Sequence, residues 1–567
     1  MRIRLGRLGD MLNEVRGELP RVGTAGSRSA MLHGEDKTQS EPGSQSPSDW
    51  RKIFLLRWVG TVGSLLIGLG GLGAGALPVV GNPFGELPFG QLMGRMLVSS
   101  SAMVFIGVGL IVIAWLLLAV MAGTPLLFHR LSAHPPQHLL KPAQAWSIFF
   151  SWTLPILVTA PLFTQDIYSY ITNGSIVVQG LDPYSAGPVQ LLGADDPLAR
   201  SVPFIWANSP SPYGPVALGI AAVISIITND SIVAAVILHR ITSLLGVVAA
   251  GWAITALAKR CRFHPATALW LGILNPLTIL HLIGGIHNES LMLGFVLVGM
   301  ELVLRGIDKL EASTSLSMST AWPGWLLTFL GGTLISAAGM VKVTGFIGLG
   351  FAGMALARFL FQRTSMKQWL SISAAAGYFL SVLILSIGAF TLASGIGLGW
   401  VTGQGGAATI RSWLSVSTDV GVASGFMGMM LGLGDHTEAI LSVTRAAGVL
   451  AAAAFMVRML FATFRGVMHP IGGLGVSTLV LVILFPVVHP WYILWAIFPL
   501  AAWANRWFFR YAVVIYSAVM SFVVLPRGLG LPPGTIAQIY LSAALGLGTL
   551  MIIGWVALRL MRGRVLN

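Results

Sequence analysis

Long runs of apolar residues, separated by short polar segments, recur along nearly the whole chain. A helix that crosses a bilayer needs about 20 mostly apolar residues. Two apolar pieces, 213–228 and 421–434, are shorter and each precedes a polar turn, so we predict partial helices at the outer surface there. The pattern predicts an all-α polytopic membrane protein with about fourteen transmembrane helices, at roughly 53–78, 98–122, 144–163, 231–258, 265–283, 290–305, 323–340, 343–362, 368–392, 439–460, 471–488, 490–504, 509–526 and 535–558.

The composition supports a protein dissolved in lipid. Hydrophobic residues make up 55% of the chain and charged residues only 10%, against about 25% charged residues in soluble domains. The net charge of +14 does not indicate a nucleic-acid partner, because much of the Lys and Arg lies in short segments between spans, where it fixes topology. The single cysteine, Cys261, excludes a disulfide framework and a cysteine-based metal site.

The basic segments also predict the orientation. Stretches such as "KRCRFH" and "ARFLFQRTSMK" belong on the cytoplasmic side of a plasma membrane, which places both termini inside. Residues 1–50 are polar and rich in Gly, Ser and Pro, so we expect a disordered cytoplasmic tail before a transmembrane domain at 51–567. The unusual polar and aromatic residues then lie outside, above all in a first outer loop at 164–212. Any chemistry would then take place on the outer side. Since ATP and nucleotide sugars are absent there, a reaction that needs an activated donor would have to receive that donor attached to lipid.

A carboxylate and several tyrosines stand at the start of this loop, in "LFTQDIYSYITNGSIVVQGLDPY". These residues are Asp166, Tyr168, Tyr170, Asp182 and Tyr184. Tyrosines at a membrane interface are also ordinary anchors, and an aspartate suits a helix cap. The motif alone leaves a structural and a functional interpretation open.

Three more outer segments carry candidate chemistry. "GGIHNES" places His287, Asn288 and Glu289 between two apolar spans, where such side chains are costly unless they meet something polar; a helix cap explains the last two but not the histidine. "HPWY" adds His489, Trp491 and Tyr492, whose rings can stack on sugars or anchor the interface. Lys342 and Arg411 are candidates for binding a lipid phosphate, and snorkelling to a headgroup is the alternative for the lysine.

At these residues the chain resembles a known family. "QDIYSYITNG…GLDPY", "SPYGPV" with Tyr213, "GGIHNES" and "HPWY" are similar to motifs of the polyprenyl-phosphomannose-dependent α-1,6-mannosyltransferases of mycobacteria and corynebacteria (MptA/MptB type). The resemblance runs from about residue 50 to the C-terminus. One departure is "HNE" at 287–289, where the family often has HND, so the acid reaches further.

The resemblance implies a GT-C glycosyltransferase fold, with Asp166 as the catalytic carboxylate. It further implies a polyprenyl-phosphate-mannose donor, a lipid-anchored mannan as acceptor (the backbone of lipomannan and lipoarabinomannan), and inversion at the sugar carbon. The residue chemistry agrees, because a carboxylate can take the proton from an attacking 6-hydroxyl and cations can stabilise a departing phosphate. The tyrosines, Asp182 and the His287 and His489 segments would bind sugar. We expect no cofactor, and nothing in the sequence demands a metal.

Two other functions share these features. A flippase for polyprenol-linked sugars would use the same lipid, but transporters place polar residues at the bilayer midplane. Here only Arg240 and Asn275 stand out in mid-span, and both are also explained by helix packing. A GT-C enzyme with another sugar or acceptor would keep Asp166 as base.

Overall fold

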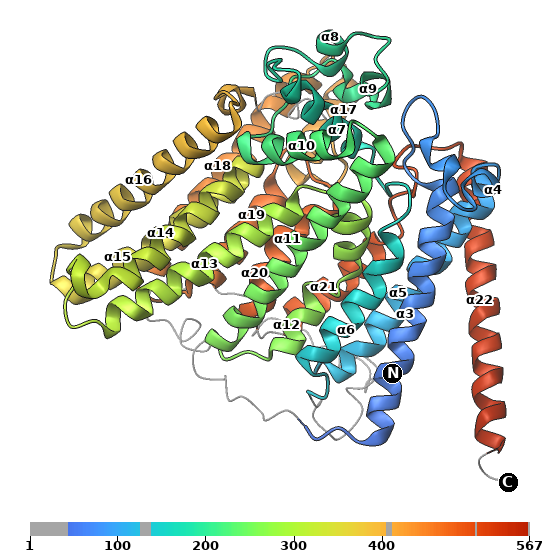
Figure 1. The fold of residues 1–567 in the computed structure, drawn as a ribbon, viewed down its shortest axis with the longest axis horizontal. Coiled ribbons are helices and arrows are strands. Elements are labelled where there is room, and N and C mark those ends of the chain that lie inside the picture. Colours follow the sequence, from blue (N-terminus) through green and yellow to red (C-terminus); the bar gives the residue numbers. More distant parts are fainter. Residues whose placement is uncertain (1–42, 125–137, 404–410, 505–506, 565–567) are drawn as a thin grey trace.

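The computed structural model describes residues 43–124, 138–403, 411–504 and 507–564 (Figure 1). Within these ranges the chain forms helices and no strand, which confirms the predicted all-α polytopic class. Nine described helices are long and apolar enough to cross a membrane, and they coincide with nine of the predicted spans. They are α3 (Pro47–Ala74), α5 (Leu97–Met121), α11 (Ile232–Arg260), α13 (Glu289–Ala312), α14 (Met318–Val341), α15 (Ile347–Thr364), α16 (Gln368–Ser394), α18 (Thr437–Phe464) and α22 (Pro533–Arg564).

The other five predicted spans are built from shorter pieces, so fourteen full crossings stay a prediction. Proline explains several of the breaks, because it removes a helical hydrogen bond and restricts the residue before it. Pro155, Pro276 and Pro486 each stand where a helix has ended or changed form. The pieces are α6 (Pro142–Thr153) with η3 (Leu154–Ile156), α12 (Pro265–Leu271) with the π-helical η5 (Thr278–Gly284), α19 (Pro470–Leu484), η9 (Pro490–Ile493) with α20 (Leu494–Trp503), and α21 (Trp507–Met520).

The first outer loop and the two predicted partial helices gather at one end of the bundle (Figure 1). There α10 (Pro215–Thr228) lies across the ends of the long helices, and α17 (Val416–Met430) lies at the same end. The loop itself carries α7 (Asp166–Val178) and the short helices α8 (Pro188–Leu192) and α9 (Phe204–Ala207). We call this the outer end, defined by α7 to α10 and α17.

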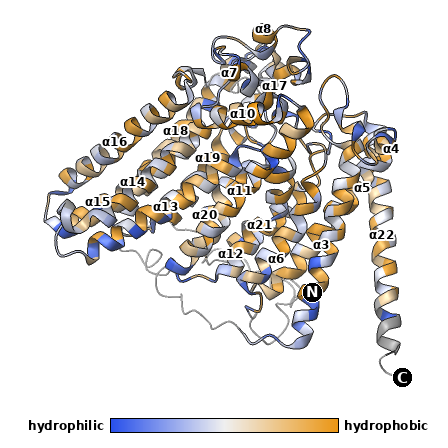
Figure 2. Cartoon of the chain, viewed as in Figure 1, coloured by the Kyte–Doolittle hydropathy of each residue, from blue (hydrophilic) through white to orange (hydrophobic). Residues whose placement is uncertain are grey.

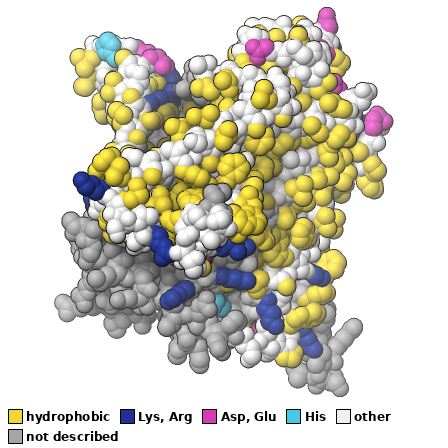
Figure 3. Space-filling model, turned by 60° about the vertical axis from the view of Figure 1, so that its left-hand side comes forward, with side chains coloured by type: hydrophobic (Ala, Val, Ile, Leu, Met, Phe, Trp, Pro, Cys, Tyr) yellow, Lys and Arg dark blue, Asp and Glu magenta, His cyan; other side chains and the backbone are white. Residues whose placement is uncertain are grey.

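Apolar residues cover the long helices between the two ends (Figure 2). In the space-filling view most of the visible Lys and Arg side chains lie in the lower half of the picture. The visible Asp and Glu side chains lie mainly at its top, at the outer end (Figure 3). This distribution is what the positive-inside rule expects if the outer end faces away from the cytoplasm. Residues 1–42 of the predicted tail lie outside the described residues, and α3 begins at Pro47 with Ser46 as its N-cap.

Glycines bring α13 and α14 into close contact. A Cβ added to Gly299 would lie 2.6 Å from the carbonyl oxygen of Gly331, and one added to Gly331 would lie 2.5 Å from that of Gly299. Such small-residue faces let two backbones approach in a membrane. Because a short connection joins the two helices, the start of α13 lies beside the end of α14, and Glu289 comes next to Lys342.

Cysteine labelling should test the orientation. With Cys261 changed to serine, we expect Asp195→Cys, exposed in the first outer loop, to react with a membrane-impermeant maleimide in intact cells. Lys309→Cys, exposed near the far end of α13, should react only after the membrane is opened. The reverse pattern would contradict the predicted topology.

Candidate active site

Asp166 is the first residue of α7 and is held by a neighbouring indole. Its backbone N–H donates to the Thr164 hydroxyl at 3.2 Å, and Trp206 Nε1 donates to its Oδ1 at 2.9 Å. The side chain is 27% exposed. Trp206 therefore fixes one of the two carboxylate oxygens, Oδ1.

His287 lies between two carboxylates. Its Nδ1 is 3.9 Å from Asp166 Oδ2 and 4.0 Å from Glu289 Oε2. The preceding Ile286 adopts a φ of +58°, a left-handed conformation that is uncommon for a branched residue, and the sharp turn directs the imidazole toward Asp166. Burial lowers the pKa of His287, while the carboxylates of Glu289 and Asp166 act in the opposite direction.

Lys342 forms an ion pair with Glu289. Its Nζ lies 2.5 Å from Glu289 Oε1 and donates to the Tyr492 hydroxyl at 3.3 Å. The ammonium also lies 4.4 Å from the Tyr492 ring centroid and 5.0 Å from that of Trp495, within the range of cation–π attraction. Burial alone would lower the pKa of Lys342, but the Glu289 carboxylate raises it above its usual value, so the ammonium stays charged.

A stack of rings covers one side of this charge pair. Trp491 lies parallel to His489, with ring centroids 4.7 Å apart, and also stacks on His287 at 4.1 Å. Burial lowers the pKa of His489 to about 4, so the ring is neutral at physiological pH. Trp491 Nε1 and His287 Nε2 are buried without a hydrogen-bond partner among the described residues. Buried polar atoms are rarely left unpaired, so both lack the partner that such atoms usually have.

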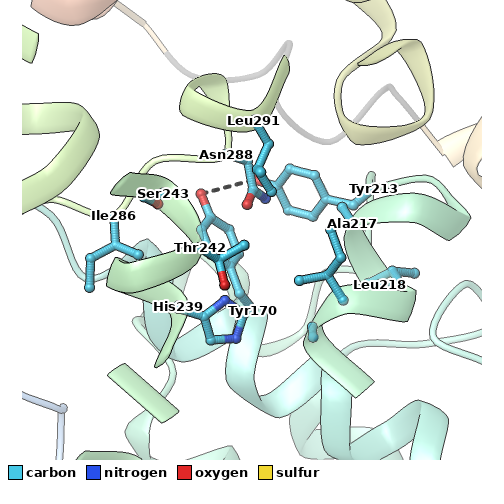
Figure 4. Close-up of a pocket in the computed structure, with 12 residues that line it drawn as sticks. Tyr170, Tyr213, Ala217, Leu218, His239, Thr242, Ser243, Ile286, Asn288 and Leu291 are labelled. Carbon is cyan, nitrogen blue, oxygen red and sulfur yellow. Dashed lines mark hydrogen bonds between the residues drawn. The ribbon is translucent and has the colours of Figure 1, made fainter. Parts of the chain in front are cut away.

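Tyr170, Tyr213 and Asn288 line a small pocket (Figure 4). The two tyrosine hydroxyls are 3.4 Å apart, and burial raises the pKa of both phenols. Asn288 is the N-cap of α13, but its side chain makes no capping hydrogen bond, so the simple cap interpretation does not account for its amide.

Three of the predicted sugar-binding residues support the others from outside the pocket. The Tyr168 side chain is fully buried and its hydroxyl donates to the Ala76 carbonyl at 2.7 Å. Tyr184 donates to the Tyr213 carbonyl at 2.9 Å, and Asp182 accepts from the Tyr184 N–H at 2.9 Å. The structure therefore shows these side chains bonded to backbone groups. Tyr184, which Asp182 holds, fixes Tyr213, whereas Tyr168 fixes the segment at Ala76.

Arg411 points elsewhere. Its guanidinium forms an ion pair with Glu438, and both side chains are largely exposed. The next residue, Ser412, donates a hydrogen bond to the Val488 carbonyl, so the backbone of Arg411 lies near the His489 turn while its paired side chain does not join Lys342. Among the described residues no group of three or more His, Cys, Asp or Glu is arranged to hold a metal.

Sequence reasoning missed Trp206 and Trp495. Trp206 is the one tryptophan between residues 164 and 212, and this is the signal that could have marked it. No sequence signal marked Trp495, because a tryptophan inside an apolar span is ordinary.

Comparison with known proteins identifies the family. Residues 57–358 match the model of the alpha-(1→6)-mannopyranosyltransferase N-terminal domain, and residues 417–552 match the MptB C-terminal domain. The chain is 56% identical over 562 residues to alpha-(1→6)-mannopyranosyltransferase B of Corynebacterium glutamicum, covering 95% of this chain and 91% of the relative. It is 39% identical over 513 residues to a probable alpha-(1→6)-mannopyranosyltransferase of Mycolicibacterium smegmatis, covering 88% of each.

A more distant relative is alpha-(1→6)-mannopyranosyltransferase A of Mycobacterium tuberculosis, with 30% identity over 470 residues, 82% of this chain and 83% of the relative. No solved structure matches the chain. The protein is therefore a multi-pass membrane protein of a glycosyltransferase class. It belongs to the MptA/MptB family of alpha-(1→6)-mannopyranosyltransferases. The GT-C fold stays a prediction from the resemblance.

The Glu289–Lys342 pair should show strong coupling in a double-mutant cycle. Lys342→Met leaves the buried Glu289 carboxylate unpaired and should cost about 3 kcal/mol. The double variant Glu289→Gln, Lys342→Met should melt at a higher temperature than the lysine variant alone, because it buries no unpaired charge. Thermal unfolding in detergent measures the stability of each single variant and of the double variant. If the two single effects simply add in the double variant, the pairing is contradicted.

The depressed pKa of His489 predicts a pH effect on stability. Since its folded pKa of about 4 lies below the unfolded value near 6.5, the unfolded state binds more protons between these values. The free energy of unfolding should therefore fall as the pH drops from about 6.5 to about 4. Below about pH 4 the contribution of His489 should change no further. His489→Gln should flatten the fall in melting temperature over that window; an unchanged profile would contradict a buried neutral imidazole.

Proposed function

We propose that this protein transfers mannose from a polyprenyl-phosphate-mannose donor to the 6-hydroxyl of a lipid-anchored mannan, with inversion, at the outer face of the plasma membrane. The observation that carries the proposal is the row formed by Asp166, His287, Glu289 and Lys342. At one end of the row is a partly exposed carboxylate and at the other a half-buried ammonium, which suit a proton acceptor and a phosphate partner. The relatives named as alpha-(1→6)-mannopyranosyltransferases support the sugar and the linkage.

The reaction divides between the two ends of this row. Asp166 takes the proton of the acceptor 6-hydroxyl as its oxygen attacks C1 of the donor mannose. The bond between C1 and the phosphate oxygen breaks, and its electron pair stays on the polyprenyl phosphate. Lys342 stabilises the charge that develops on that phosphate. The proton ends on Asp166, which is open to solvent and can release it.

An apolar cavity beside Lys342 supports a lipid donor. It lies between α13, α15, α19 and α20 and is lined by Met292, Val296, Gly348, Leu474 and Trp495. Trp495 connects the two regions, because its ring also contacts the Lys342 ammonium. A phosphate at Lys342 would therefore have an apolar surface beside it, against which the first part of its hydrocarbon chain would lie.

The aromatic residues suit a sugar between these groups. Sugar rings present apolar faces that stack on aromatic side chains, and their hydroxyls need donors and acceptors. Tyr170, Tyr213 and Asn288 offer polar groups on the side of α10, and the unpartnered Trp491 Nε1 and His287 Nε2 offer two more on the side of the ring stack.

Asp166→Asn should test the base directly. In proteoliposomes supplied with radiolabelled polyprenyl-phosphate-mannose and a short α-1,6-mannoside, we expect the rate of extension to fall by about 10²–10⁴-fold, the usual contribution of a general base. Asp195→Asn is the matched control, since that carboxylate lies exposed in the same loop, and it should keep the wild-type rate.

Two outcomes would contradict the proposal. Near-normal extension by Asp166→Asn would show that another group takes the proton. If the wild-type protein moves the donor lipid between leaflets and forms no glycosidic bond, the protein is a transporter.

A further inference from the structure

Arg240 is a buried cation on α11 whose hydrogen bonds are all made to backbone. Its side chain has no solvent exposure. Nη1 donates to the carbonyls of Leu157 and Thr159 at 2.9 and 2.8 Å, Nη2 to those of Ala160 and Gly284 at 3.1 and 3.4 Å, and Nε to that of Ile283 at 3.3 Å. A guanidinium has five N–H donors, so these five bonds account for all of them.

The five carbonyls belong to two segments in which a predicted span loses its helical form. Residues 157–160 follow η3, where α6 has ended, and residues 283–284 close the π-helical η5. Carbonyls without a helical partner are costly in the hydrocarbon region unless protein shields and pairs them. Arg240 pairs both sets at once, and the Leu162 N–H links them directly by donating to the Gly284 carbonyl at 3.0 Å.

Both segments lead straight into the candidate active site. The first continues through Phe163 to Asp166, and the second turns at Ile286 to His287. The distance between Asp166 and His287 therefore depends on how the two segments are held together. The guanidinium binds both segments and adds five hydrogen bonds to the single backbone bond between Leu162 and Gly284.

We propose that Arg240 is a positioning residue that sets Asp166 against His287 by clamping the segments 157–160 and 283–284. Its effect on transfer rests on the proposed function, whereas the clamp itself does not. Arg240 touches neither donor nor acceptor in this arrangement. Its loss should lower kcat more than it raises KM, because an interaction that aligns reacting groups acts mainly on the bound complex.

The test combines kinetics with amide hydrogen exchange on the full-length protein in detergent. Arg240→Met should increase exchange in residues 157–165 and 283–288 while α3 and α22 keep their protection. It should also lower kcat by about 100-fold, the scale expected for a misplacement of about 1 Å, with the KM for donor little changed. Arg240→Lys keeps the charge but has only three donors, so it should fall between the wild type and the methionine variant.

Arg510→Met is the matched control. Arg510 is also a buried arginine, 3% exposed, whose Nη1 donates to a backbone carbonyl, that of Gly123, at 3.1 Å. Its substitution should lower the melting temperature without increasing exchange at 157–165 and 283–288. If Arg240→Met does not fold, Arg240→Lys alone carries the comparison.

The outcomes separate the clamp from the function. Unchanged exchange in both segments, or the same pattern in Arg510→Met, overturns the clamp. Increased exchange with wild-type kcat overturns the positioning role. A wild-type protein that forms no glycosidic bond overturns the proposed function, and the exchange measurement then still decides whether the clamp exists.

Discussion

The need to pair every backbone carbonyl inside the bilayer governs the architecture of this protein. Regular helices meet that need internally, and nine long helices do so here among the described residues. The candidate active site requires irregular backbone instead, because the chain has to leave helical geometry to bring Asp166 and His287 together. Arg240 satisfies five of the carbonyls that this departure exposes. A buried cation without a carboxylate is costly, and here the carbonyl dipoles of two irregular segments take the place of the counter-ion.

The second constraint is the close packing of α13 and α14. The glycine contact between Gly299 and Gly331 brings the helices close enough for Glu289, at the start of one, to pair with Lys342, at the end of the other. Gly214 makes a similar close approach, since a Cβ there would lie 2.5 Å from the Met340 carbonyl oxygen. That contact places Tyr213 beside the same helix end. Small residues that carry no reactive group thus help to set the distances within the site.

The sequence indicated which polar residues stand at the outer end, but not which of them contact one another. Asp166, His287, Glu289 and Lys342 were singled out as candidates because polar residues at a membrane border are costly and conspicuous. The contacts of these residues were not predicted, because Glu289 and Lys342 meet through helix packing, and Trp206 reaches Asp166 across an irregular loop. Nine spans were located by length and hydropathy. The early end of α6 was missed because the apolar run continues past Pro155, and hydropathy does not distinguish a lipid-facing helix from an irregular segment buried in protein.

The pairing of Lys342 with Glu289 also bears on how the proposed reaction would be accelerated. A donor phosphodiester carries one negative charge, and it meets an ammonium whose charge Glu289 already balances in part, so ground-state attraction is weak. As the bond to C1 breaks, a second negative charge develops on the phosphate and draws the ammonium more strongly than before. Interactions that strengthen only toward the transition state raise the rate. Glu289 would therefore serve catalysis in two ways, by keeping Lys342 charged where burial disfavours it and by limiting its hold on the unreacted donor.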